Sequence, residues 1–328
     1  MNSRTLGKTG RTVSEIGFGA WQIGADWGAV DEDDAVRTLH AAADSGVTFF
    51  DTADVYGDGR SERLVGRLRR ERPDDDLTIA TKMGRRAPAQ LVEHYSSANL
   101  RAWNDRSREN LGVDTLDLVQ LHCPPTDLYY VPAVFEDLEK MVDEGRIAKY
   151  GVSVERVEEA LKAIEYPNVA TVQIIFNPFR QRPAHLFFEH AKRHDVGIIV
   201  RVPLASGLLS GKYTRETTFG ADDHRTFNRA GEAFDVGETF AGVPFEVGLD
   251  AVEELRPLVP EGATLAQLAL RWILDHDAVS TVIPGARNPE QAEANAAASA
   301  LAPLPDDAHA TIERVYEERI APHVHHRW

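Results

Sequence analysis

Four side chains capable of acid–base chemistry follow short apolar runs in the first half of the chain: Asp51, Tyr56, Lys82 and His122. An unperturbed tyrosine, with a pKa of about 10, is too weak an acid to deliver a proton quickly near neutrality. A nearby ammonium group lowers the pKa of a phenol because it stabilises the phenolate, and a carboxylate paired with that ammonium keeps it charged and oriented. These residue types predict a proton donor, Tyr56, assisted by Lys82 and Asp51.

This set of groups suits the reduction of a carbonyl, in which a proton reaches the oxygen while a hydride reaches the carbon. Tyr56 and His122 would meet the negative charge that develops on the oxygen. No side chain supplies hydride, so the interpretation requires a nicotinamide cofactor. Each residue alone also has a structural explanation, such as a salt bridge for Asp51 and Lys82, but their joint occurrence at strand ends favours function.

Strand-like apolar runs deliver these residues and alternate with stretches of helical periodicity, clearest at residues 33–45, 133–144, 154–164 and 265–275. This alternation is typical of parallel α/β architecture, which is either a (β/α)8 TIM barrel or a doubly wound sheet. Polar residues at several strand ends favour the barrel, and the segment 17–22 lacks the Gly-x-Gly-x-x-Gly pattern of a dinucleotide-binding doubly wound sheet. The predicted strands are residues 15–18, 48–51, 77–82, 116–122, 147–153, 169–175, 196–202 and 279–283.

The segment 50–57, Phe-Asp-Thr-Ala-Asp-Val-Tyr-Gly, resembles the signature of the aldo-keto reductase family, and the segment 111–118 resembles its second signature. The four residues named above match the family's catalytic residues position by position. The resemblance covers nearly the whole chain and is to bacterial or archaeal aldo/keto reductases. It implies a (β/α)8 barrel whose bottom is closed by a β-hairpin formed by residues 1–15. Because no segment reads as a linker, we expect a single domain over residues 1–328.

The same resemblance implies where a cofactor binds. The segment 19–21 resembles the one that borders nicotinamide and substrate, Ser153 and Gln173 match the residues that hold the carboxamide, and Val154 stands where the family has Asn. The expected cofactor contacts are Gly19, Ala20, Trp21, Asp51, Ser153, Gln173, Arg201, Val202, Pro203, Leu204, Ser206, Leu208, Gly211, Lys212, Gly285, Arg287, Gln291 and Asn295.

Two parts of this predicted cofactor site bear on its chemistry. Arg201 could stack its planar guanidinium on the nicotinamide or reach a phosphate, and the segment 206–212 resembles the family's pyrophosphate-covering belt. Arg287 would pair with an adenosine 2′-phosphate beside a helix N-terminus, although an arginine that satisfies its own loop is the alternative. We expect NADP(H) in preference to NAD(H), even though Gly285 and Gln291 stand where some relatives have basic residues.

Residues 206–248 form a long stretch rich in Gly, Asp, Phe and Thr after the seventh predicted strand. Its length and position predict a loop that covers the substrate. A disordered surface excursion is the alternative, and the phenylalanines of the stretch argue against it.

The bulk composition excludes several classes of partner. The chain has 52 acidic and 36 basic residues, a formal charge of −16, which repels nucleic acid and anionic membrane surfaces. A single cysteine, Cys123, permits no intrachain disulfide and is typical of a reducing compartment. With no signal-like or membrane-spanning run, we expect a cytoplasmic monomer or small homo-oligomer that acts without a metal.

The sequence therefore predicts an NADP(H)-dependent oxidoreductase that reduces aldehydes or ketones to alcohols, with a small carbonyl or alcohol as its substrate. Three alternatives stay open. The first is an NAD-dependent sugar or polyol dehydrogenase of the same fold, and the second is a cofactor-binding redox sensor or regulatory subunit with little turnover. The third is a barrel lyase or aldolase that uses Lys82 to form a Schiff base.

Overall fold

The structure of the protein is a computed structural model, and it describes residues 1–24 and 30–328. Within these residues, eight parallel strands follow one another in chain order through one sheet, each hydrogen-bonded to the next. The strands are β3 (Phe18–Gly19), β4 (Phe49–Asp51), β5 (Thr78–Met83), β6 (Leu116–His122), β7 (Ile147–Ser153), β8 (Thr171–Ile175), β9 (Gly197–Arg201) and β10 (Val279–Val282).

The first and last strands meet and close the sheet. The backbone N–H groups of Gly17 and Gly19 donate to the carbonyl oxygens of Val282, at 2.8 Å, and Pro284, at 3.0 Å. A Cβ on Gly19 would lie 2.8 Å from the carbonyl oxygen of Ile283, so glycine permits this approach where a larger residue would clash. A sheet joined edge to edge is the (β/α)8 TIM barrel that the sequence predicted, and the doubly wound alternative is wrong.

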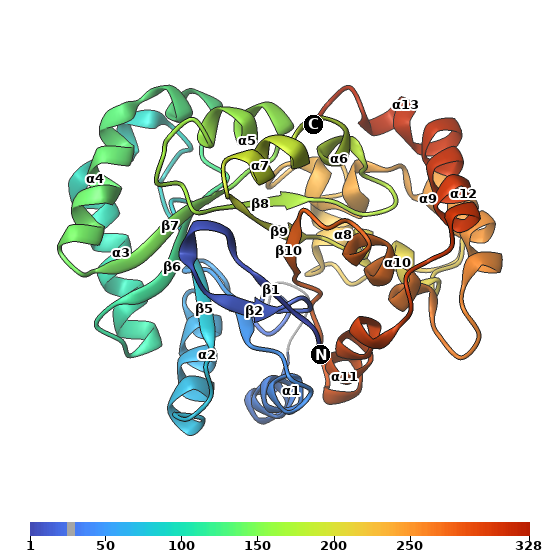
Figure 1. The fold of residues 1–328 in the computed structure, drawn as a ribbon, viewed down its shortest axis with the longest axis horizontal. Helices are drawn as coiled ribbons and strands as arrows, with labels where there is room; N and C mark the ends of the chain where they lie inside the picture. Colours follow the sequence, from blue (N-terminus) through green and yellow to red (C-terminus); the bar gives the residue numbers. More distant parts are fainter. Residues whose placement is uncertain (25–29) are drawn as a thin grey trace.

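Helices surround the strands of the barrel (Figure 1). Because helices on one side and packed side chains on the other cover the strands, all residues of β4, β5, β6, β8, β9 and β10 are buried. The helices are α1 (Glu32–Asp44), α2 (Arg60–Glu71), α3 (Ser97–Leu111), α4 (Pro132–Asp143), α5 (Val157–Ala163), α6 (Arg182–Leu186), α7 (Phe188–Arg193), α8 (His224–Phe227), α9 (Phe245–Leu255), α10 (Leu265–Leu274), α11 (Pro289–Ala297), α12 (Asp306–Val315) and α13 (Ala321–Val324).

Local sequence signals set the ends of several helices. The side chain of Asp31 caps α1 by accepting from the N–H of Asp33 at 2.9 Å, and Thr264 with Gln267 forms a capping box on α10. Gly112 ends α3 in the left-handed conformation, with φ of 70°, which glycine adopts without strain. Each of these caps satisfies backbone groups that the helix itself leaves without partners.

The N-terminal hairpin closes one end of the barrel. Its strands, β1 (Ser3–Thr5) and β2 (Thr12–Ser14), pair antiparallel. Leu6 and Val13 are fully buried. They belong to a hydrophobic cluster inside the barrel, which confirms the predicted position of the hairpin at the bottom of the barrel. Their partners in that cluster come from the strands of the barrel or, for the last, directly follow one: Phe49, Ala80, Leu118, Ile199 and Ile283.

Two predicted boundaries differ from the structure. The first strand was expected at residues 15–18, but the backbone of Glu15 and Gly17 bonds to Val282 of β10, and regular pairing with β4 begins at Phe18. The helix expected from residue 154 begins at residue 157, because the Glu159 carboxylate accepts from the backbone N–H groups just before it. The other predicted strands and the remaining predicted helices agree with the structure to within two residues.

The long stretch after β9 is folded rather than extended. It contains the one-turn helix α8, the short 3₁₀ helices at Val236–Glu238 and Phe240–Gly242, and the start of α9. The ring of Phe219 packs against Tyr213, Phe240 and Phe245 at centroid distances of 5.2, 5.9 and 6.1 Å. Aromatic packing therefore gives this loop a core of its own. No helix in the described ranges is both long and apolar enough to cross a membrane.

Candidate active site

A layer of polar side chains lies at the carboxyl ends of neighbouring strands. Strand register places Lys82 beside Gln120, His122 beside Ser153, and Ser153 beside Gln173. Asp51 is the last residue of β4, the strand next to β5. Since the carboxyl ends of parallel strands meet at one end of a barrel, residues far apart in sequence come together there.

Lys82 is the centre of this layer. Its side chain is 1% exposed, and its ammonium group forms an ion pair with Asp51. The same nitrogen donates to the carbonyl oxygen of Thr52 at 2.9 Å and to the hydroxyl of Tyr56 at 3.4 Å. An ammonium group has three donors, and here all three are used.

The second oxygen of the Asp51 carboxylate is also satisfied. It accepts from the side-chain amides of Gln173, at 2.8 Å, and Gln120, at 3.1 Å. We expected Gln173 to hold a cofactor carboxamide; in this structure its amide nitrogen donates to Asp51. Gln120 was missed by the sequence analysis, although it stands two residues before His122 and therefore points to the same side of β6.

Aromatic rings form the walls around the Tyr56 hydroxyl. The ring of Trp21 stacks on that of Tyr56 at a centroid distance of 6.0 Å, and the ring of His122 meets Tyr56 edge-on at 5.9 Å. Trp21 in turn contacts His224 and Phe234 of the long loop, at 5.0 and 5.9 Å. The long loop therefore reaches the mouth of the barrel beside the candidate proton donor.

Burial and neighbouring charges set the protonation states of these groups. Burial outweighs the opposing effect of Lys82 and raises the pKa of Tyr56 above its usual value. The simple expectation of a lowered tyrosine pKa is therefore wrong for the resting site. Burial alone would lower the pKa of Lys82, but Asp51 and Tyr56 raise it above its usual value. Burial, together with Arg85 and Lys82, holds the pKa of His122 well below its usual value, so its imidazole is neutral near pH 7.

A buried network of charges lies beside this layer. Arg201 pairs with Glu155, at 2.9 Å, and with Glu238, at 3.5 Å, while Arg85 forms ion pairs with the same two carboxylates. Burial raises the pKa of Glu155 to about 8. Burial opposes ionisation of Glu238 as well, but the two arginines hold its pKa below the usual range. We expected Arg201 to stack on a nicotinamide or reach a phosphate; in this structure its guanidinium belongs to this network.

Cys123 borders the same network. Its Sγ lies 3.5 Å from Oγ of Ser153, and burial raises the pKa of its thiol to about 12. Among the described residues, Cys123, Glu155 and Glu238 are the one set of three acidic, thiol or imidazole groups whose ligand atoms converge. Their carboxylates already carry arginine partners, so the arrangement is that of an ion-pair network.

The segment expected to cover a pyrophosphate follows β9 as a tight turn. Ala205–Ser210 forms 3₁₀ turns in which Ser206 has φ of 53°, a left-handed conformation that is strained for this residue. Its hydroxyl donates to the carbonyl of Glu238 at 3.0 Å and accepts from the N–H of Phe240 at 3.1 Å. The remaining predicted residues of this region lie in or next to the turn: Val202, Pro203, Leu204, Leu208, Gly211 and Lys212.

The predicted adenosine site lies at the start of α11. Asn288 caps this helix by accepting from the N–H of Gln291 at 2.9 Å, and the Gln291 side chain accepts from the N–H of Arg287 at 2.9 Å. Asn295 donates to the carbonyl of Gly285 at 3.2 Å. The Arg287 side chain is exposed, and within the described ranges its guanidinium forms no hydrogen bond or ion pair. It is therefore available to an anion, and the alternative of an arginine that satisfies its own loop does not hold in this structure.

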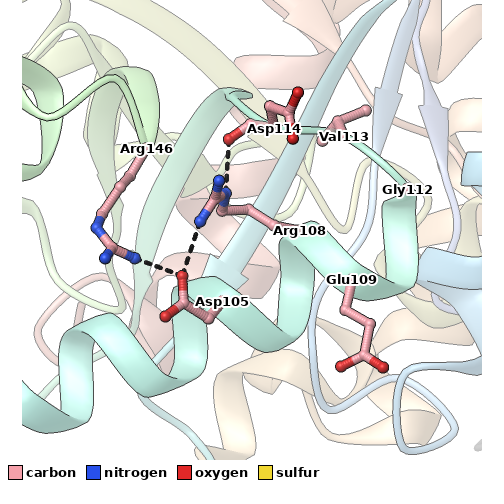
Figure 2. Close-up of a pocket in the computed structure, with 7 residues that line it drawn as sticks. All are labelled: Asp105, Arg108, Glu109, Gly112, Val113, Asp114 and Arg146. Carbon is pink, nitrogen blue, oxygen red and sulfur yellow. Dashed lines mark hydrogen bonds and ion pairs between the residues drawn. The ribbon is translucent and has the colours of Figure 1, made fainter.

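A surface hollow of about 520 Å³ lies away from this layer, where α3 ends and β6 and β7 begin (Figure 2). Arg108 donates to Asp105 at 2.9 Å and to the carbonyl of Asp114 at 2.6 Å, and Arg146 pairs with Asp105 as well. Figure 2 shows Glu109 pointing away from these contacts. Because the hollow is at the amino ends of the strands, it is not part of the candidate site.

Comparisons with known proteins agree with this geometry. The model of the Aldo/keto reductase family matches residues 15–317. The aldo-keto reductase YhdN of Bacillus subtilis (strain 168) is 32% identical over 299 residues, which are 90% of this chain and 87% of that protein. The chain belongs to the aldo/keto reductase family, and its fold and family are those of an oxidoreductase that acts on carbonyl groups.

Two solved structures are similar throughout. Aldo-keto reductase AKR11C1 from Bacillus halodurans, in its holo form, has a TM-score of 0.76 and 27% sequence identity, with 96% of each chain covered. The glycerol dehydrogenase AKR11B4 from Gluconobacter oxydans has a TM-score of 0.75 and 28% identity, with 98% of this chain and 96% of that chain covered. Both likenesses extend over the barrel and the segments that carry the polar layer.

Proposed function

We propose that the chain reduces aldehydes or ketones to alcohols with NADP(H), and that Tyr56 is the proton donor. The observation that carries this proposal is the position of the Lys82 ammonium group, bonded to Asp51 on one side and to the Tyr56 hydroxyl on the other. We further propose that the substrate is a small carbonyl or alcohol and that the protein acts in the cytoplasm.

The residues present fit a nicotinamide nucleotide. Ser153 and Gln173 offer a hydroxyl and an amide at adjacent strand ends, where a carboxamide could exchange hydrogen bonds with them. Arg287 offers an exposed guanidinium at the N-terminal end of α11, where anions are favoured. Bound nicotinamide would supply the hydride, because no amino-acid side chain can.

The chain's own residues would manage the proton and the developing charge. Tyr56, kept protonated by burial, would donate its proton to the carbonyl oxygen. Lys82 would stabilise the phenolate left behind, and Asp51 would keep Lys82 charged and directed at it. His122 is neutral, so its imidazole would polarise the carbonyl by donating a hydrogen bond rather than by transferring a proton.

The same geometry argues against the lyase or aldolase alternative. A Schiff base requires a neutral, accessible amine. Lys82 is 1% exposed, and Asp51 and Tyr56 raise the pKa of its ammonium group above the usual value. A protonated, fully hydrogen-bonded ammonium group is a poor nucleophile.

An NAD-dependent polyol dehydrogenase is a second candidate. The observation that favours it is the similarity over nearly the whole chain to a glycerol dehydrogenase, together with the absence of basic side chains at Gly285 and Gln291. The two candidates share the proton chemistry at Tyr56 and differ in cofactor and direction.

Steady-state kinetics with both cofactors, in both directions, tests the proposal. The purified protein would be assayed with NADPH or NADH and 4-nitrobenzaldehyde or methylglyoxal, and with NADP⁺ or NAD⁺ and glycerol. Carbonyl reduction with a preference for NADPH is the expected result. Faster oxidation of glycerol with NAD⁺ would favour the second candidate. Tight binding of either cofactor without turnover would favour a redox sensor and contradict the proposed activity.

A further inference from the structure

The indole of Trp328 is packed into the long loop after β9, although 93 positions separate it from its hydrogen-bond partner there, Asp235. Trp328 is 3% exposed, and its Nε1 donates to Oδ1 of Asp235 at 2.9 Å. Two glycines make room for the ring. A Cβ on Gly242 would lie 2.5 Å from the indole, and one on Gly237 would lie 2.9 Å from it. Residues 235–242, called the anchor segment below, are therefore shaped around this side chain.

Arg180 lies against the face of the same indole. Its Cζ is 3.8 Å from the ring centroid, its side chain is nearly fully buried, and its Nε and Nη1 have no hydrogen-bond partner within the described ranges. Nη2 reaches the carbonyl of Gly237 at 3.5 Å. Burial lowers the pKa of Arg180 to about 9. The charges of Glu155 and Asp235 oppose this lowering. Because cation–π contacts are strongest when desolvated, the indole face is a principal contact of this guanidinium.

The opposite side of the anchor segment contacts the mouth of the barrel. Glu238 pairs with Arg85 and Arg201, and its carbonyl accepts from the Ser206 hydroxyl. The next residue but one, Phe240, donates its N–H to the same hydroxyl. The anchor segment thus connects Trp328 to Arg201 and Ser206, two of the residues expected to contact the cofactor.

The backbone of the anchor segment is strained. Phe240 and Ala241 have φ of 53° and 57°, left-handed conformations that residues other than glycine rarely adopt. Such strain persists only where surrounding contacts hold the backbone in place. The contacts at this point include the indole of Trp328 and the Ser206 hydroxyl, and the ring of Phe240 also packs on Phe219 and Phe245.

We propose that Trp328, stacked on Arg180, is a positioning residue for cofactor binding: it holds the anchor segment at the barrel mouth, so that Glu238 keeps Arg201 and Ser206 in their places. The inference rests on the proposed NADP(H) function. In the native protein the anchor segment is ordered before the cofactor arrives, and this preorganisation favours tight binding and slow release. Without the indole, the anchor segment would become ordered only when the cofactor binds, and the entropy lost in ordering it would lower the cofactor affinity.

Three variants separate this role from a general loss of stability. Trp328→Ala removes the ring, and Trp328→Phe keeps a ring for Arg180 but loses the hydrogen bond to Asp235. Asp235→Ala removes that hydrogen bond without altering Trp328, but it also removes the bond that the carboxylate accepts from the N–H of Gly237 at 2.6 Å, so Trp328→Phe is the cleaner of the two. The matched control is Trp103→Phe, on α3 at the other side of the barrel (Figure 1). The melting temperature of each variant is recorded first.

The first readout needs no cofactor: hydrogen exchange of the backbone amides of residues 235–242 in the full chain. The second is the rate of NADPH release, measured by stopped-flow fluorescence. We expect Trp328→Ala to speed exchange in the anchor segment and to speed NADPH release roughly tenfold, with the KM for NADPH rising more than kcat changes. Trp328→Phe and Asp235→Ala should show smaller changes in the same direction, and Trp103→Phe should match the native protein.

The outcomes separate the inference from the function on which it rests. If the native protein binds neither NADPH nor NADH, the proposed function fails and with it the positioning role. If the native protein binds NADPH but all three variants release it at the native rate, the inference is overturned while the proposed function stands. Native exchange of the anchor segment in Trp328→Phe and Asp235→Ala would also overturn it, even if Trp328→Ala does not fold.

Discussion

The ammonium nitrogen of Lys82 lies 3.4 Å from the Tyr56 hydroxyl oxygen and 5.0 Å from the centroid of the Tyr56 ring. Burial keeps the resting phenol protonated, since it raises the pKa of Tyr56 despite this neighbour. The ammonium group stabilises the phenolate once a proton has left. Tyr56 therefore keeps its proton at neutral pH, and the charge of Lys82 stabilises the phenolate that forms during proton transfer.

Tyr56→Phe tests this role. We expect kcat for carbonyl reduction to fall about 10²- to 10⁴-fold, the usual contribution of a general acid. Affinity for the cofactor should be nearly unchanged, because the phenyl ring can still stack on Trp21. Turnover and fluorescence titration measure the two effects. Tyr130→Phe, at an exposed tyrosine, is the control, and substantial activity in Tyr56→Phe would show that another group donates the proton.

The pH dependence of reduction should carry no contribution from His122. Burial and the nearby cations Arg85 and Lys82 lower the pKa of this imidazole well below its usual value. The imidazole therefore gains a proton only in acid, far below the pKa of about 6.5 of a free histidine. A profile of kcat/KM against pH, compared between the native protein and His122→Asn, checks this. A limb near pH 6.5 that disappears in the variant would contradict it.

Asp54 makes a separate prediction about stability. Its carboxylate is fully buried, and neither oxygen has a hydrogen-bond partner among the described residues. Burial, with a contribution from Glu62, raises the pKa of Asp54 to about 7. The folded protein keeps this proton up to about pH 7, whereas the unfolded chain releases it near pH 4, so stability falls as the pH rises through that window.

Asp54→Asn should relieve this penalty, because an amide cannot ionise. At pH 8 we expect the variant to be more stable than the native protein by roughly 2 to 4 kcal/mol, with the difference vanishing near pH 4. Urea unfolding at the two pH values measures it. Asp74→Asn, at an exposed aspartate, should change little at either pH. A variant destabilised equally at both pH values would mean that the native carboxylate has partners.

Arg287 should determine the preference between the two cofactors. Its exposed guanidinium stands at the start of α11. If it binds a 2′-phosphate, Arg287→Leu should weaken NADPH binding about 10- to 100-fold, the value of a charge-assisted contact, and leave NADH binding nearly unchanged. Calorimetric titrations with both cofactors measure this, with Arg193→Leu on α7 as the control. Equal losses for both cofactors would assign Arg287 a structural role.

Much of the barrel could be predicted because local patterns determine it. The strands β6 and β7 are largely apolar runs, and the sequence predicted both with the ends that the structure shows. The first strand was misplaced because its residues 15–17 complete the barrel through β10, a contact between the two ends of the sheet. Such long-range closure leaves no signal in a short window of sequence.

The site was predictable in part for the same reason. Asp51, Lys82 and His122 lie at strand ends, so alternation and register bring them together. The sequence did not predict the network around Arg201, because Glu238 reaches it from a loop whose path depends on packing against Trp328. The sign of the Tyr56 pKa shift was also missed, since it depends on burial, which a residue list does not contain.

The most direct test of the account is the fate of isotope in a single turnover. NADPH carrying deuterium at the transferable position on C4 would be mixed with 4-nitrobenzaldehyde and the native protein, and the alcohol would be analysed by mass spectrometry and NMR. The account predicts one deuterium on the carbinol carbon and a solvent-derived proton on the oxygen, with formation of this alcohol lost in Tyr56→Phe. Alcohol formed without deuterium, or at the native rate in the variant, would contradict it.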